Sequence, residues 1–164
     1  MLPGIKQFDL TDRVAIITGG SKGLGEAMGA GLASAGANLM LVSRNGDEAK
    51  ASAEKLASEY DCKAIGSAAD VSVQAEMEAM AAACLKEFGR IDILINSAGI
   101  NIRGSTDEVS YEEFAEVQRI NVDGTWLACR AVLPHMKEKQ YGRIINMASA
   151  LGLGFDEAEA LKIE

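Results

Sequence analysis

Aromatic side chains are scarce in this chain of 164 residues, and other common features are absent. Phe, Trp and Tyr together make up 5% of the sequence, so we expect a core of aliphatic side chains and alanine. No apolar run approaches the roughly 20 residues of a membrane span. The first residues lack the basic and then apolar layout of a signal peptide. These absences argue against a membrane protein and against secretion, and they favour a cytoplasmic protein.

Cysteine pairs and an excess of basic residues are also missing. Cys62, Cys84 and Cys129 are odd in number and widely spaced, with no Cys-x-x-Cys pair. We therefore expect each to be a small buried hydrophobe in a reducing compartment, and we expect no metal site. The chain has 16 Lys and Arg against 24 Asp and Glu, a formal net charge of -8. This balance argues against a nucleic-acid partner.

Short apolar runs alternate with longer alanine-rich segments along the chain, whose length suits one domain. Such alternation is typical of a parallel sheet with helices on both faces. We expect strands at residues 13–18, 38–43, 63–68, 91–96 and 143–148. We expect helices at residues 24–35, 47–60, 73–88 and 110–139, the last bent or interrupted near residues 121–124 and at Pro134. The pattern predicts an α/β fold, a doubly wound, Rossmann-like sheet of at least five parallel strands.

A glycine-rich turn joins the first expected strand to the first expected helix. Its sequence is Thr18-Gly19-Gly20-Ser21-Lys22-Gly23-Leu24-Gly25. Backbone N–H groups and the helix dipole at such a junction attract a phosphate, and glycine lets the backbone approach it closely. We expect the pyrophosphate of a dinucleotide to be held here by Gly19, Ser21, Lys22, Gly23, Leu24 and Gly25. A plain tight turn is the alternative.

The end of the second expected strand indicates which dinucleotide binds. It reads Val42-Ser43-Arg44-Asn45, with no carboxylate before Asp47. An NAD site places an Asp or Glu near this point for the ribose hydroxyls, whereas an NADP site places an Arg there for the 2′-phosphate. We expect Arg44 and Lys22 to converge on that phosphate; two solvated surface cations are the alternative. The sequence predicts NADP, with NAD less favoured.

Five short motifs in this order resemble those of the short-chain dehydrogenases/reductases, over residues 7–153. They are Thr18-Gly19-x-x-x-Gly23-x-Gly25, Asp70-Val71, Asn96-Ser97-Ala98-Gly99, Asn121-Val122 and Ile145-Asn146-x-x-Ser149. Within the family the chain looks most like gluconate 5-dehydrogenases and 3-oxoacyl-acyl-carrier-protein reductases. The resemblance implies that Asp70 and Val71 contact the adenine. It also implies that Asn96, Ala98 and Gly99 line the nicotinamide side of the cleft.

The resemblance implies two catalytic residues in this chain, whereas the Tyr and Lys that act with them in the family have no match. Ser149 would hydrogen-bond the substrate oxygen, and Asn121 would support a water-mediated proton relay. The general acid of the family is the Tyr of a Tyr-x-x-x-Lys motif, but no tyrosine here has a lysine four residues later. Family spacing places that tyrosine near Lys162. We therefore expect an NAD(P)-binding domain over residues 1–153, incomplete at its C-terminal side, and a non-family tail over residues 154–164.

The sequence thus predicts an NAD(P)-dependent oxidoreductase that moves a hydride between nicotinamide and a small carbonyl or secondary alcohol, of sugar-acid or 3-oxoacyl type. Without the Tyr–Lys pair we expect this truncated form to be inactive. The alternatives are a non-catalytic NADP-binding module and a fragment with no stable fold. The fifth strand would form an open apolar edge, so we expect self-association or marginal stability. Assembly into a homo-oligomer is a further alternative.

Overall fold

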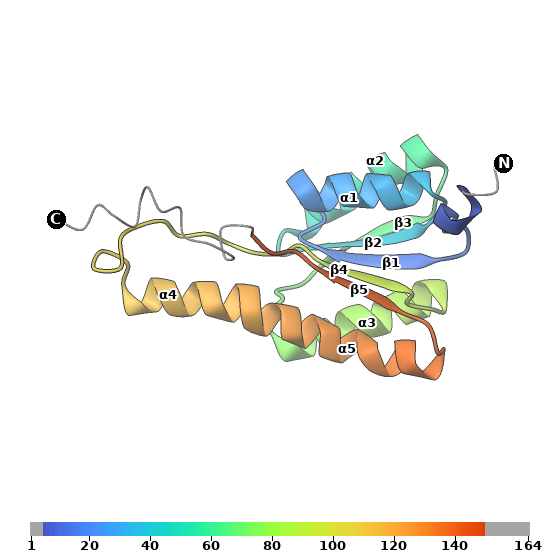
Figure 1. Ribbon diagram of the computed structural model, residues 1–164. Coiled ribbons are helices and arrows are strands. Elements are labelled where there is room, and N and C mark those ends of the chain that lie inside the picture. The colour runs from blue at the N-terminus through green and yellow to red at the C-terminus, as the bar shows by residue number, and fades with distance from the viewer. Residues whose placement is uncertain (1–4, 150–164) are drawn as a thin grey trace.

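The sheet is parallel throughout and carries helices on both faces in the computed structural model, which describes residues 5–149 (Figure 1). Its strand order is β3-β2-β1-β4-β5. The strands are β1 (Val14–Thr18), β2 (Asn38–Ser43), β3 (Ala64–Ala68), β4 (Ile93–Asn96) and β5 (Arg143–Asn146). The chain changes winding direction between β1 and β4, the place where open α/β sheets bind ligands. The predicted doubly wound, Rossmann-like fold is confirmed.

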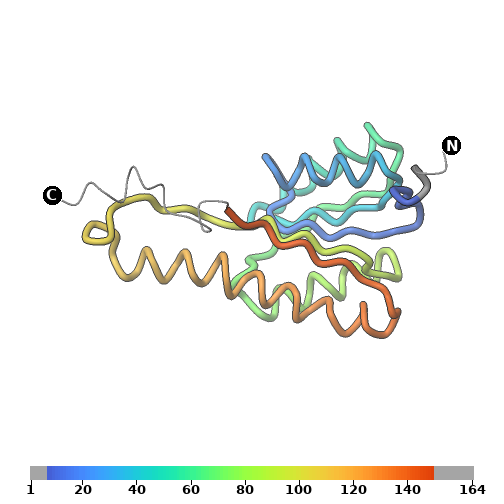
Figure 2. Tube along the Cα trace, in the orientation of Figure 1, coloured from blue at the N-terminus to red at the C-terminus, as the bar shows by residue number. Residues whose placement is uncertain are grey.

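The helices divide between the two faces of the sheet. Helices α1 (Gly23–Ser34) and α2 (Gly46–Tyr60) lie on one face, and α3 (Gln74–Phe88) and α5 (Gly124–Glu138) lie on the other (Figure 1). Helix α4 (Tyr111–Gln118) leads into α5 and projects beyond the sheet (Figure 2). A single turn of 3-10 helix, η1 (Ile5–Phe8), precedes β1. Within residues 5–149, no helix is long and apolar enough to cross a membrane.

The core has one apolar layer on each face of the sheet. The layer beneath α1 and α2 is aliphatic, and the layer beneath α3 and α5 contains Met40, Met77, Met80 and Met136. No aromatic side chain is among the buried core residues of the described part, as the composition predicts. Cys84 is buried in the second layer, and burial raises the pKa of its thiol to about 12. Cys62 and Cys129 are only half-buried, so full burial was wrongly expected for these two.

The long helix changes its winding where α4 meets α5. Residues Arg119–Asp123 form a π-helical turn, in which an extra residue is accommodated within the helix. The predicted break near residues 121–124 is thereby explained. Helix α5 runs through Pro134, so an interruption there is wrong. Proline leaves the carbonyl of Arg130, four residues earlier, without its helical partner, and Arg130 lies on the exposed side of the helix.

A buried carboxylate ties the amino ends of β1 and β4 together. The Asp92 side chain is 4% exposed and accepts a hydrogen bond from the backbone N–H of Val14 at 2.9 Å. Arg90 donates to it through Nε at 2.6 Å and Nη2 at 2.7 Å, and Arg13 donates through Nη1 at 3.2 Å. The Arg13 guanidinium also lies 4.0 Å from the ring centroid of Tyr141. Asp92 is therefore the centre of a charged network that joins two central strands.

Strand β5 forms one edge of the sheet within the described residues. It ends at Asn146, two residues before its predicted end. Ile145 and Met147 are each 45% exposed at this edge, and Trp126 of α5 is exposed as well. Among residues 5–149 no further strand pairs with β5, whereas an open edge in the whole chain and the self-association expected from it stay predictions.

Candidate cofactor site

The loop after β1 lies tightly against the loop after β4. Gly19 has a φ of 67°, and a Cβ there would lie 2.8 Å from the backbone nitrogen of Ala98. A Cβ on Gly25 would lie 2.1 Å from the carbonyl oxygen of Gly19. Only glycine fits these two positions, because real Cβ atoms do not approach backbone so closely. The glycines therefore bring β1, the start of α1 and the β4 loop into contact.

The amino end of α1 is free of a side-chain cap. Lys22 occupies the N-cap position and makes no capping hydrogen bond through its side chain. The first N–H groups of a helix have no partners inside it, and they carry the positive end of its dipole. Glu26, the acidic residue of the first turn, is held by Lys55 at 2.7 Å. This end of α1 is therefore suited to bind a phosphate.

Thr18 connects the same two loops from beneath. Its Oγ1 accepts hydrogen bonds from the backbone N–H groups of Ser97 at 3.2 Å and Ala98 at 3.3 Å. It also lies 3.4 Å from the carbonyl oxygen of Ile95, to which it donates. The sequence motif contains Thr18 without assigning it a role. A hydroxyl residue at the end of an apolar strand is the signal that identifies it.

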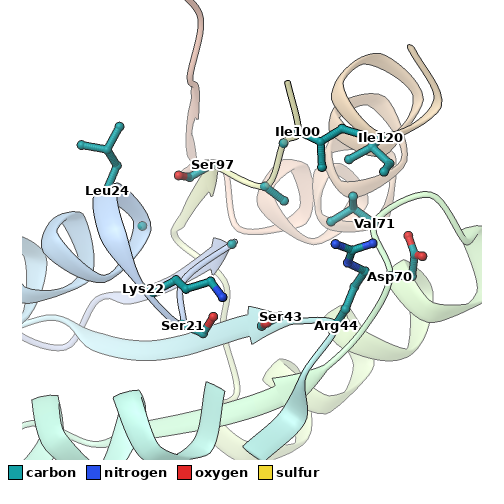
Figure 3. Close-up of a pocket in the computed structure, with 14 residues that line it drawn as sticks. Ser21, Lys22, Leu24, Ser43, Arg44, Asp70, Val71, Ser97, Ile100 and Ile120 are labelled. Atoms are coloured by element: carbon teal, nitrogen blue, oxygen red, sulfur yellow. The ribbon is translucent and has the colours of Figure 1, made fainter. Parts of the chain in front are cut away.

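A cavity of about 350 Å³ opens between these loops (Figure 3). Most of the residues predicted to bind the cofactor line it, namely Gly19, Ser21, Lys22, Leu24, Gly25, Arg44, Asp70, Val71, Ala98 and Gly99. Gly23 and Asn96 do not line it. Four lining residues were not predicted: Ser43, Ser97, Ile100 and Ile120. Ser43 and Ser97 end or directly follow strands, so their positions were available from the expected strand ends.

The two cations assigned to a 2′-phosphate, Arg44 and Lys22, line the same cavity from different loops. Figure 3 shows the guanidinium of Arg44 extending toward Asp70, whereas Lys22 lies beside Ser21. Lys22 Nζ is 3.3 Å from Glu48 Oε2, and Ser21 Oγ donates to the same oxygen at 3.4 Å. The expected convergence of Arg44 and Lys22 on a 2′-phosphate therefore stays a prediction, and it requires Lys22 to share or leave its pair with Glu48. Glu48, which the sequence did not single out, already holds Lys22.

Asp70 is kept ionised at the rim of the cavity. Ser72 donates two hydrogen bonds to its Oδ1, from Oγ at 2.6 Å and from the backbone N–H at 2.9 Å. The side-chain bond is the largest cause that lowers the pKa of the Asp70 carboxyl below its ordinary 3.8, and the charges of Arg119 and Arg44 lower it further. Partial burial opposes these effects. Asp70 is thus a hydrogen-bond acceptor for a ligand at neutral pH.

Asn96 supports the cavity from below. It is buried, and its Nδ2 donates to Asn146 Oδ1 at 2.9 Å and to Cys129 Sγ at 3.3 Å. Its Oδ1 is the buried side-chain oxygen without a hydrogen-bond partner in the described part of the chain. The amide pair links the carboxyl ends of β4 and β5, where Asn96 and Asn146 are in register. Asn96 therefore positions the loop that follows it.

A second cavity of about 380 Å³ adjoins the first and shares Leu24, Ser97, Ala98 and Gly99 with it. Its other lining residues are Asn96, Asn121, Thr125, Met147, Ala148 and Ser149. The structure therefore brings the two predicted catalytic residues, Asn121 and Ser149, to one cavity beside residues 97–99. None of Tyr60, Tyr111 and Tyr141 lines either cavity. Lys162 lies outside the described residues, as does the predicted tail at 154–164.

The side chain of Asn121 holds the loop after β4. Its Nδ2 donates to the carbonyl oxygen of Ile100 at 2.9 Å, and its Oδ1 accepts from the N–H of Ile100 at 2.9 Å. A Cβ on Gly99 would lie 3.1 Å from the same Oδ1. Both polar ends of the amide are therefore used by the backbone of one residue. A direct part for Asn121 in proton transfer stays a prediction.

Comparisons with known proteins agree with this geometry. The family model described as short chain dehydrogenase matches residues 13–158. D-threitol dehydrogenase of Mycolicibacterium smegmatis is 39% identical over 142 residues, which are 87% of this chain and 54% of that protein. Solved structures of levodione reductase and of NAD+-bound xylitol dehydrogenase both match with a TM-score of 0.85, at 38% and 27% identity.

Each of these structures is matched over 89% of this chain and over 57% and 56% of its own chain. The chain thus spans little more than half the length of the proteins it matches. The family match nevertheless covers most of the chain, including the glycine-rich turn at residues 18–25, the motif at residues 96–99 and the residues that line both cavities. The chain belongs to the short-chain dehydrogenase family of oxidoreductases.

Proposed function

We propose that this chain binds a nicotinamide dinucleotide, NADP in preference to NAD, and forms the cofactor-binding part of an oxidoreductase. The observation that carries the proposal is the continuity of the first cavity. It runs from the uncapped end of α1 to Arg44 and Asp70 on one side and to residues 97–100 on the other. A cavity of this extent, across the point where strand winding reverses, suits an extended dinucleotide with a ring system at each end.

The residues present fit that cofactor. Gly19 and Gly25 leave space against the backbone that a Cβ would fill, and the pyrophosphate would lie there, on the N–H groups of α1. The adenosine end would lie at Asp70 and Val71, with Arg44 available to a 2′-phosphate. The nicotinamide end would lie against residues 97–100, beside the second cavity.

The second cavity is the proposed place of the substrate. A bound nicotinamide supplies or accepts a hydride. Ser149 would hydrogen-bond the oxygen of the reacting carbon, while Asn121 holds the loop that borders both cavities. We propose a small carbonyl compound or secondary alcohol as substrate, of sugar-acid or 3-oxoacyl type. The matched proteins are named as dehydrogenases of D-threitol and xylitol and as a reductase of levodione. These names support a substrate of the alcohol or carbonyl class.

Arg44→Asp should reverse the cofactor preference. The substitution removes the cation beside the 2′-phosphate and places a carboxylate where ribose hydroxyls would bind. A charged hydrogen bond contributes about 1.5–3 kcal/mol, so NADP should bind about 10- to 150-fold more weakly. NAD affinity should stay the same or improve. Fluorescence titration of the purified chain with NADPH and NADH measures both affinities.

Arg130→Asp is the matched control for this test, because Arg130 is exposed and lies over Trp126, away from both cavities. It should leave both affinities unchanged. Equal affinities of the original chain for the two cofactors would refute the NADP preference, as would an equal loss of both in Arg44→Asp. Failure of both cofactors to bind would refute the proposed function itself.

The 164-residue chain should bind its cofactor without turning over substrate. A positioned general acid contributes about 10²–10⁴ in rate, and the sequence has no Tyr-x-x-x-Lys pair to supply it. NADPH absorbance should therefore stay constant with sugar-acid ketones and 3-oxoacyl thioesters, while levodione reductase with its own substrate serves as a positive control. A steady, substrate-dependent decrease that disappears in Ser149→Ala would show this expectation to be wrong.

The same measurements separate the remaining alternatives. A non-catalytic NADP-binding module would bind cofactor, melt cooperatively and show no turnover with any carbonyl substrate. An unstable fragment would show neither a cooperative melt nor saturable binding. The open edge of β5 is the feature that favours the second alternative.

A further inference from the structure

We infer that Glu48 is a specificity-determining residue, which competes with the 2′-phosphate of NADP for Lys22 and so limits the preference for NADP over NAD. The inference rests on the proposed function, because it concerns the same cofactor site. It assigns a role to a residue that no sequence motif contains. Glu48 lies in the first turn of α2, behind the glycine loop.

Glu48 contacts the two polar side chains of the glycine loop through one oxygen. Its Oε2 lies 3.3 Å from Lys22 Nζ and accepts from Ser21 Oγ at 3.4 Å. Ser21 and Lys22 line the cofactor cavity, and both also line a further cavity of about 400 Å³ between α1 and α2. Glu48 lines only this further cavity. Ser21 and Lys22 thus lie between the cofactor cavity and Glu48. The ion pair directs the ammonium group of Lys22 toward the Glu48 carboxylate.

The backbone at Glu48 is fixed relative to the glycine loop. Asn45 caps α2, since its Oδ1 accepts from the N–H groups of Asp47 at 3.1 Å and Glu48 at 3.3 Å. One turn later, buried Ser52 donates from Oγ to the carbonyl oxygen of Gly20 at 3.4 Å. The cap fixes the first turn of α2, and the Ser52 bond joins the helix to the loop that carries Lys22. The backbone of Glu48 is therefore held within reach of the loop, where the carboxylate contacts Ser21 and Lys22.

A bound 2′-phosphate would have to share or break the Lys22–Glu48 pair. It would carry up to two negative charges close to a third, and like charges repel. NAD has a hydroxyl group at this position and leaves the pair intact. The penalty thus falls on NADP alone. None of the ion pairs of residues 5–149 includes Arg44, although its charge helps to lower the pKa of the Asp70 carboxyl.

The test uses adenosine 2′,5′-bisphosphate and adenosine 5′-monophosphate as probes, which differ only in the 2′-phosphate. Calorimetric titration of the full chain at low salt should show Glu48→Gln binding the bisphosphate about three- to fivefold more tightly than the original chain. The modest size follows from the exposure of the pair, with Lys22 78% and Glu48 43% exposed. Affinity for the monophosphate should not change.

Two further variants identify the cause. In a Lys22→Gln background the Glu48→Gln substitution should have no effect on the bisphosphate, because the competition needs the lysine. Glu54→Gln is the charge-matched control, since Glu54 lies further along α2, paired with Lys50 at 3.9 Å and away from the cofactor cavity. It should leave both affinities unchanged. High salt should reduce the advantage of Glu48→Gln, because salt screens exposed charges.

Three results would overturn the inference: bisphosphate affinity that stays equal or falls in Glu48→Gln, an equal gain for both probes, or a gain that persists without Lys22. Its failure is distinguishable from failure of the proposed function. If only the inference fails, the original chain binds both nucleotides, and the affinities of the variants differ from those expected. If the proposed function fails, neither the probes nor the dinucleotides bind the original chain, although circular dichroism shows that it is folded.

Discussion

Gly25→Ala is expected to abolish cofactor binding, with affinity for NADP and NAD falling at least about 100-fold, or about 2.7 kcal/mol. The new Cβ would be placed 2.1 Å from the carbonyl oxygen of Gly19. Neither group can rotate away, because the carbonyl oxygen belongs to the backbone and the backbone fixes the position of the Cβ. Helix α1 must therefore shift from the loop, and its N–H groups leave the pyrophosphate position. Overpacking of this kind also costs about 1–3 kcal/mol of stability. Titration with NADPH and a thermal melt measure the two effects.

Gly31→Ala supplies the matched control within the same helix. A Cβ at Gly31 would meet no atom within 4 Å, and alanine favours a helix over glycine by about 1 kcal/mol. This variant should bind cofactor as the original chain does and melt at a higher temperature. If Gly25→Ala retained cofactor affinity within a few-fold, the close packing of α1 on the loop would not be what forms the site.

Asp92→Ala should be among the most destabilising single substitutions outside the cofactor site, with a cost of about 3 kcal/mol. It leaves the buried N–H of Val14 without its acceptor and removes the shared partner of Arg90 and Arg13. The arginines are partly exposed, so water stabilises them in part and keeps the cost below the upper end for buried pairs. Urea unfolding measures the change. Asp123→Ala, at an exposed aspartate without a capping bond, should change stability little.

The same carboxylate makes stability depend on pH in the acid range. Burial alone would raise the pKa of Asp92, but hydrogen bonds from Arg90, Val14 and Arg13 outweigh it and lower the pKa below its ordinary 3.8. A lowered pKa in the folded state means that the stabilisation is complete above 3.8 and is lost as the pH falls through the folded value. Asp92→Asn should therefore lose stability less steeply than the original chain below about pH 4. Parallel acid dependences of the two proteins would contradict this account.

Several features followed from the sequence because local patterns decide them. Strand β1 is one example, because a continuous run of apolar residues fits a strand that is buried on both faces. The glycine turn is another, because only glycine fits where the turn packs against neighbouring backbone atoms. The placement of Arg44, Asp70 and residues 97–99 around one cavity followed from strand ends that meet at one edge of a parallel sheet. The two motif residues Asn121 and Ser149 also reached one cavity as expected.

Features that depend on side-chain orientation could not be obtained in this way. Nothing local indicates that Glu48 pairs with Lys22, because the two residues lie on different helices whose spacing only packing decides. The amide of Asn121 bonds the backbone of Ile100, and no residue type at position 100 encodes that contact. The start of β4 was misjudged because Ile91 is as buried as a strand residue, although the strand begins at Ile93.

The π-helical turn at Arg119–Asp123 makes the length of this helix as important as its residues. Each residue of an α-helix turns the chain by about 100°, so losing one residue here would rotate α4 by that angle relative to α5. The exposed Tyr111 and Phe114 would then face a new direction, and Asn121 would leave Ile100. Over evolutionary time, the segment should accept substitutions on its exposed side while single-residue insertions and deletions are eliminated. The loop at residues 101–109 is not helical, so a change in its length would not rotate one helix against another, and we expect its length to vary instead.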